Sequence, residues 1–217
     1  MPSTFPGALD SFTDPLSNSP LNSPSHSAQH ADLNDAVEKV ETYMGLVKVV
    51  PTSVTNGSLS ATGTVTIGNA VSSVTVNGAF SSLYSNYRII LSGIAVSAST
   101  NSAYLTLNGS TGSTYSANGI YMIPSSTTVN GLAQNQQTTG FWLGISGTTF
   151  SATIDIMNPF LAKATNVVGQ SATAGGSSYY NTFMGGDSNA ASSANFSLVQ
   201  QTSNLTGGTI TVYGYRI

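Results

Sequence analysis

Apolar and polar residues alternate along most of the chain from Pro51 onward, with the two-residue period of a strand that has one buried face. Turn dipeptides such as Gly-Asn and Asn-Gly interrupt this alternation at short intervals. The alternating runs predict strands over residues 60–67, 71–76, 87–93, 103–109, 140–145, 151–157, 194–199 and 208–215. Short strands at this spacing, without strand–helix alternation, predict a mainly β fold, an antiparallel β-sandwich or jelly roll over residues 51–217.

A different period marks the segment that precedes this region. Between residues 27 and 44, apolar side chains recur at alternating spacings of four and three, at Leu33, Val37, Val40 and Met44. This spacing is an a/d seam and predicts a short helix, with His30 and His26 on the same line. A lone helix of about 18 residues is marginally stable in water. Self-association into a bundle would bury the seam, and packing on the chain's own domain is the alternative.

The chain therefore divides into three segments. Residues 26–50 are the self-associating helix and its linker, and the seam contacts are expected from His30, Leu33, Val37, Val40 and Met44. Residues 1–25 contain five prolines, which remove backbone donors and oppose regular structure. This segment is either a disordered arm or an extended arm that becomes ordered on a partner surface. Its docking anchors would be the recurring apolar residues Phe5, Leu9, Phe12, Leu16 and Leu21.

Charge is scarce in this sequence. The 217 residues include five Lys and Arg, eight Asp and Glu, two His and no Cys, for a net charge of -3. Nucleic-acid binding is not expected, because it usually requires a basic patch that replaces phosphate counterions. No apolar run approaches the roughly 20 residues that cross a bilayer, so membrane insertion is not expected either. The N-terminus also lacks the basic and apolar regions of a secretory signal.

The residue inventory argues against catalysis. No His follows His30, so a Ser–His–Asp triad within the β region is excluded. The acids beyond Glu41 are Asp155 and Asp187, and a glycosidase would need two such carboxylates flanking one bond. We expect neither an enzyme nor a cofactor. Asp155 is the expected ion-pair partner of Arg88, and His26 with His30 would either bind an ion or make ordinary packing contacts.

Two polar–aromatic runs are candidates for recognition of a host-surface glycan. They are Gln134, Asn135, Gln136 and Gln137, and Tyr179, Tyr180 and Asn181. Sugars are bound by ring stacking together with amide hydrogen bonds, and such groups usually lie on loops. Both runs are expected in turn-rich segments. The alternative is that they are ordinary polar loops.

Several stretches resemble a known class of proteins. Residues 5–12 (FPGALDSF) and 22–37 (NSPSHSAQHADLNDAV) resemble a recurring N-terminal segment of virion structural proteins of tailed bacteriophages, including tail-fibre and head-fibre proteins. Residues 207–216 (GGTITVYGYR) resemble the closing strand of many phage β-sandwich tips, and residues 87–93 (YRIILSG) are similar to such strands.

The resemblance implies a virion component, usually a homotrimer, that docks by its N-terminus on other tail or capsid proteins and displays its C-terminal domain. Such a protein assembles in the host cytoplasm. The expected function is that of a short tail fibre or receptor-binding protein, because the long repeats of a fibre shaft are missing. A capsid fibre or head decoration protein is the first alternative. A secreted adhesion module is the second, and the missing signal disfavours it.

Overall fold

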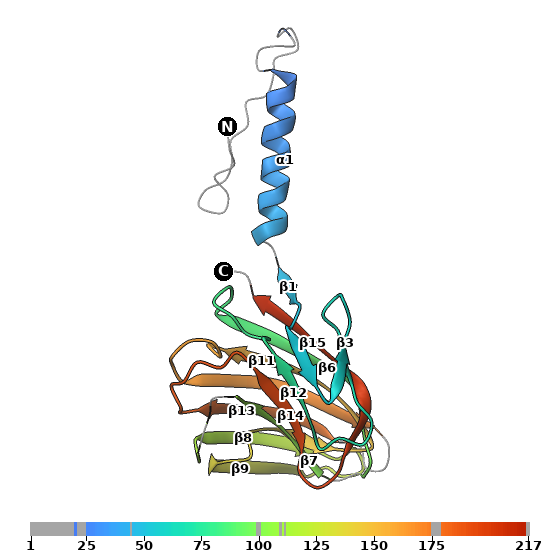
Figure 1. The fold of residues 1–217 in the computed structure, drawn as a ribbon. Helices are drawn as coiled ribbons and strands as arrows, with labels where there is room; N and C mark the ends of the chain where they lie inside the picture. The colour runs from blue at the N-terminus through green and yellow to red at the C-terminus, as the bar shows by residue number, and fades with distance from the viewer. Residues whose placement is uncertain are drawn as a thin grey trace. The chain divides into compact units, whose positions relative to one another are not determined.

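The computed structural model of the chain describes residues 20, 25–43, 45–98, 101–108, 110, 112–174 and 179–215 (Figure 1). These residues belong to two compact units, one that contains the helix and ends at Leu46, and one that spans Val47–Tyr215. Part of the expected contact set lies outside the described residues, namely the arm anchors Phe5, Leu9, Phe12, Leu16 and Leu21 and the last seam residue, Met44.

The helix α1 spans His26–Tyr43, as the four–three spacing predicts. Ser25 caps its N-terminus, because the Ser25 hydroxyl accepts a hydrogen bond from the Ala28 N–H at 3.2 Å. Beyond its C-terminus, Gly45 adopts a positive φ of 85°, a conformation that ends many helices. The seam side chains are substantially exposed in the single chain, with Leu33 at 54%, Val37 at 48% and Val40 at 41%.

Apart from α1, the regular structure of the described residues is β-structure. The strands are β1 Leu46–Val49, β2 Ser53–Thr55, β3 Gly57–Leu59, β4 Val65–Ile67, β5 Ser73–Asn77, β6 Asn86–Val96, β7 Asn101–Leu107, β8 Tyr115–Met122, β9 Val129–Gln137, β10 Phe141–Ser146, β11 Thr149–Met157, β12 Thr165–Ala174, β13 Tyr180–Asp187, β14 Phe196–Gln200 and β15 Leu205–Tyr215. Each of the eight runs predicted from the alternation contains all or part of a strand.

The strands form two sheets with antiparallel pairing (Figure 1). The large sheet has the order β3-β4-β15-β6-β11-β12-β13-β8-β9, and β1 also pairs with β15. The small sheet has the order β10-β7-β14-β5-β2. One apolar cluster contains side chains of both sheets, and β10 packs against β8, β12 and β13. This confirms the mainly β, antiparallel architecture and is consistent with a β-sandwich.

Two rings of β10 fill the core over the β8–β13 part of the large sheet. Trp142 is 1% exposed and Phe141 is fully buried. A Cβ added at Gly119 of β8 would overlap the Trp142 ring, and one at Gly185 of β13 would lie 2.6 Å from the Ser116 carbonyl oxygen and 3.3 Å from the Phe141 ring. Glycine in these strands therefore leaves space for the aromatic side chains of the opposite sheet.

Candidate functional site

The large sheet has one face toward the core and one face away from it, which we call the outer face. Along β13 the buried and exposed positions alternate, so that Phe183 is 1% exposed whereas Tyr180 and Met184 are 52% and 58% exposed. The large apolar side chains exposed on this face are Ile120, Met122, Val129, Val168, Tyr180 and Met184. All six belong to β8, β9, β12 and β13, four adjacent strands that the alternation did not predict.

These side chains are neighbours across the strands. Tyr180 pairs in register with Met122 of β8 and with Ala172 of β12. Met184 pairs with Val168, and Met122 pairs with Val129 on the edge strand β9. Directly paired side chains on one face lie within contact distance, and we call the six residues together the outer-face patch. Exposed apolar residues grouped in this way often mark an interaction site.

An open groove of about 460 Å³ lies beside Tyr180 in this face. Its lining combines apolar side chains with uncharged hydrogen-bonding groups, including Ile120, Met122, Thr153, Gln170, Tyr180 and Thr182. Gln170 pairs with both Thr182 and Thr153, so an amide and two hydroxyls follow one row across the sheet. An aromatic ring beside neutral donors and acceptors suits a neutral polar ligand that also has apolar faces.

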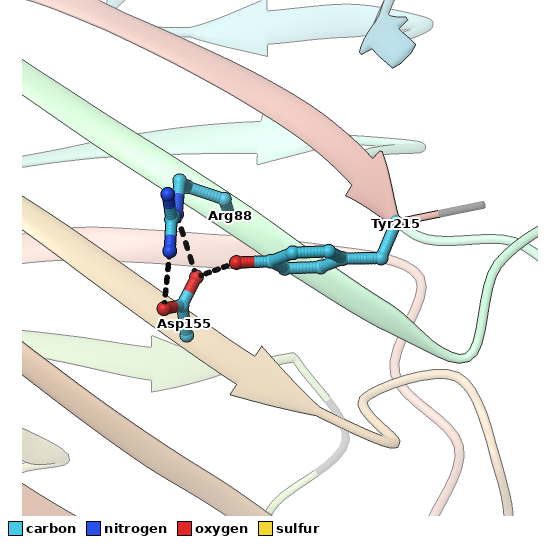
Figure 2. A network of polar contacts seen from close by, with 3 residues as sticks. All are labelled: Arg88, Asp155 and Tyr215. Carbon is cyan, nitrogen blue, oxygen red and sulfur yellow. Dashed lines mark hydrogen bonds and ion pairs between the residues drawn. The ribbon is translucent and has the colours of Figure 1, made fainter. Parts of the chain in front are cut away.

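The outer face also carries an ion pair, which Figure 2 shows from close by. Arg88 of β6 donates two hydrogen bonds to the carboxylate of Asp155 on β11, from Nε at 2.8 Å and from Nη2 at 2.7 Å. The two residues pair directly in register. The Tyr215 hydroxyl donates to the same carboxylate at 2.6 Å, and the Arg88 guanidinium lies 5.5 Å from the Tyr215 ring centre. The expected Arg88–Asp155 pair is confirmed.

This pairing shifts the protonation equilibria of its members. Hydrogen bonding to Arg88 lowers the pKa of Asp155 below the ordinary carboxyl value, and the same hydrogen bond raises the pKa of Arg88. Burial, followed by the hydrogen bond to Asp155, raises the pKa of Tyr215, so its hydroxyl stays a donor at neutral pH. On β6, β8, β9, β11, β12 and β13 the charged residues are Arg88, Asp155 and the buried Asp187, so the charges of the outer face there cancel.

The lowered pKa of Asp155 predicts a pH-dependent stabilisation. A carboxylate with a lower pKa in the folded state stabilises the fold above its unfolded-state pKa, and this stabilisation is lost as the pH falls through the folded pKa. Asp155→Asn is therefore expected to lower the free energy of unfolding by about 1 kcal/mol at neutral pH, because the pair is partly exposed. At an acidic pH below the usual carboxyl pKa range, the free energies of unfolding of the variant and the wild type should be equal. Urea unfolding at both pH values measures this, and an equal difference at both would contradict it.

The first run of proposed receptor contacts does not lie in a loop. Residues 134–137 belong to the edge strand β9, so the expected turn-rich placement was wrong. The pairing of β8 with β9 shifts register between Tyr115 and Ala117, and this shift accommodates residues 134–137. Gln136 takes a positive φ of 51°. Gln134 donates a hydrogen bond to the Tyr104 hydroxyl at 3.4 Å, whereas Asn135 and Gln136 are exposed. Gln137 donates to the Asn135 carbonyl at 2.9 Å.

The second run is divided between the two faces of the sheet. Tyr179 is 8% exposed and its ring lies edge-on to Tyr121, with centroids 6.0 Å apart. Asn181 is 3% exposed and donates to the Ser171 hydroxyl at 2.9 Å. The turn-rich placement was wrong for Tyr180 and Asn181, because β13 begins at Tyr180 and alternate residues point to opposite faces, whereas Tyr179 lies just before the strand. Tyr180 alone of these three is exposed, and a receptor role for the two runs stays a prediction.

The two acids considered for glycoside hydrolysis lie on opposite faces of the large sheet. Asp155 is on the outer face, where it pairs in register with Val168. Val168 in turn pairs with Met184, and Asp187 lies three residues beyond Met184 on the same strand, with 2% exposure. Carboxylates on opposite faces cannot flank one glycosidic bond, so this pair does not form a glycosidase site.

The helix contributes a second candidate surface. Its exposed seam residues Leu33, Val37 and Val40 continue along the same line to His30 and His26, near the N-terminus of α1. The two histidine rings contact each other, with Nε2 atoms 3.1 Å apart. No group of three or more His, Cys, Asp or Glu side chains suited to a metal ion occurs among the described residues. Among the described residues, no helix is both long enough and apolar enough to cross a membrane.

No protein-family model matches the chain, and no curated protein matches its sequence.

Proposed function

We propose that the chain is a structural protein of a tailed-bacteriophage virion, a homotrimer joined through the seam of α1. The observation that carries this proposal is the exposure of Leu33, Val37 and Val40 on an 18-residue helix. Such a helix is about 27 Å long and is only marginally stable alone. Packing of three seams would bury these side chains and stabilise the helices together.

The N-terminal resemblance to phage virion proteins supports the same function. In this proposal the arm of residues 1–25 docks on a tail or capsid protein through its apolar anchors, and the β-unit is displayed. The strand order supports a jelly-roll type of sandwich, because β14 lies between β5 and β7 while β15 lies between β4 and β6. Strands that are distant in sequence are neighbours in this way in Greek-key and jelly-roll folds.

Within this function we assign receptor contact to the groove beside Tyr180. The exposed ring can stack on a sugar, and the Gln170 amide and Thr182 hydroxyl can hydrogen-bond to it. One such contact typically gives a dissociation constant on the order of 1 mM. Three copies on one spike would raise the effective affinity, because the later contacts form at high effective concentration.

Tyr180→Ala is therefore expected to reduce the adsorption of particles to host cells by about tenfold or more, because the ring contact is lost in every copy. Leu83→Ala is the control, since Leu83 is 77% exposed but lies outside the outer-face patch and does not line the groove. Adsorption and the abundance of the protein in purified particles are measured for both variants. Unchanged adsorption, with the protein located on the capsid, would replace the receptor-binding assignment with the head-decoration alternative. Absence of the wild-type protein from particles would overturn the virion assignment.

A further inference from the structure

The two histidines of the chain form a pair on one face of the first turns of α1. His26 and His30 are four residues apart, which places their side chains one above the other on a helix. Their Nε2 atoms are 3.1 Å apart, and their rings meet at 88° with centroids separated by 4.4 Å. This contact is a hydrogen bond between the two imidazoles, and both side chains are exposed, so a solute can reach the nitrogens and replace it.

The separation of these nitrogens suits a shared metal ion. Zinc binds imidazole nitrogen at about 2.0–2.1 Å. Two nitrogens on one ion are then about 2.9 Å apart at a right angle and about 3.4 Å apart at the tetrahedral angle. The observed 3.1 Å lies between these limits. Imidazole is a preferred ligand of Zn²⁺, Ni²⁺ and Cu²⁺, whereas Mg²⁺ and Ca²⁺ prefer oxygen.

We propose that His26 and His30 chelate a divalent transition-metal ion of the zinc class through their Nε2 atoms. One chain supplies two ligands, and solvent fills the remaining positions in an isolated chain. A second step rests on the proposed trimer. There His26 takes a d position and His30 takes an a position of the seam that contains Leu33 and Val37. The histidines of neighbouring copies then lie close enough to complete the coordination. The ion would thereby stabilise the bundle at its N-terminal end.

The untagged full chain is expected to bind Zn²⁺ with a dissociation constant on the order of 10 µM or lower in isothermal titration calorimetry, and not to bind Mg²⁺ at that level. His26→Ala and His30→Ala should each weaken Zn²⁺ binding by at least about tenfold, because a single imidazole lacks the effective concentration of a chelate. Zn²⁺ should also increase the helical circular dichroism signal of the wild type and not that of either variant.

A matched control keeps both imidazoles and changes only their spacing. His30→Ala combined with Ala31→His places the two side chains five residues apart, on different faces of the helix. This variant should bind Zn²⁺ as weakly as the single substitutions. Wild-type affinity in the control or in either single variant would overturn the proposal, as would a wild-type chain without micromolar Zn²⁺ binding.

Failure of the metal site can be distinguished from failure of the trimer. The Val37→Asp, Val40→Asp chain, if separated into monomers, should retain histidine-dependent Zn²⁺ binding with lower affinity than the wild type. Equal affinity would overturn completion of the site by neighbouring copies. A wild-type monomer with histidine-dependent binding would overturn the proposed trimer and leave the chelate standing. A wild-type trimer without such binding would overturn the chelate alone.

Discussion

Replacing Val37 and Val40 with Asp is expected to convert the proposed trimer into monomers of 22.2 kDa. In a three-helix bundle these positions face the seam, so assembly would bury six unpaired carboxylates. Each costs several kcal/mol when it is taken out of water without a partner. The association constant should therefore fall by more than about a hundredfold. The molecular mass measured by light scattering at micromolar concentration shows the change.

The matched control adds the same two charges on the opposite side of the helix. Ala28 and Ala31 are exposed and occupy positions outside the seam, and Ala31→Asp lowers helix propensity. Ala28→Asp combined with Ala31→Asp should keep the wild-type mass. A monomeric wild type would contradict the proposed seam, and dissociation of the control would show that charge or helix propensity, and not the seam, determines the mass.

Gly119→Ala is expected to destabilise the β-unit by about 1–3 kcal/mol, the usual cost of adding a methyl group to a filled core. The new Cβ would overlap the Trp142 ring and lie 3.1 Å from the Thr182 carbonyl oxygen. Trp142 cannot move away easily, because it is 1% exposed and its indole N–H donates to the Ser102 hydroxyl at 3.2 Å. Urea denaturation followed by tryptophan fluorescence measures the change.

Gly131→Ala provides the comparison for this substitution. Gly131 lies on the neighbouring strand β9, paired with Ile120, and a Cβ there would meet nothing within 4 Å. Alanine is expected to be neutral or to stabilise by up to about 1 kcal/mol, because it restricts the unfolded chain. Equal destabilisation by the two substitutions would show that strand geometry, and not contact with Trp142, determines the cost.

Some strands could be predicted from the sequence and others could not, and glycines such as Gly119 illustrate the reason. The eight predicted runs contain β-branched or aromatic residues at alternating positions, and each contains all or part of a strand. Strands β8, β9, β12 and β13 were not predicted, because Gly, Ala or Asn, which have low strand propensity, interrupt the β-branched and aromatic pattern in each of them. Gly119 is favourable in β8 because the Trp142 ring of β10 occupies the space beside it, and Gly185 is favourable in β13 because the Ser116 carbonyl oxygen and the Phe141 ring lie beside it. Such contacts join distant segments and have no local signature.

The candidate surfaces were predictable to different degrees. The helix and its seam depend on residues within two heptads, so periodicity alone determined the positions of Leu33, Val37 and Val40. The Arg88–Asp155 pair followed from the scarcity of other charges in the β region. The outer-face patch did not follow, because it requires β8, β9, β12 and β13 to be adjacent in one sheet.

Local sequence thus determined the element types of the helix and of the β-branched strands, since spacing and propensity act over a few residues. Tertiary structure decided which side chains are accessible. Tyr179, Tyr180 and Asn181 are consecutive polar–aromatic residues, yet only Tyr180 is exposed. A shift of one residue in the register of β13 would exchange the buried and exposed positions. That register is determined by pairing with β8 and β12 and by the apolar core on one side, which are long-range contacts.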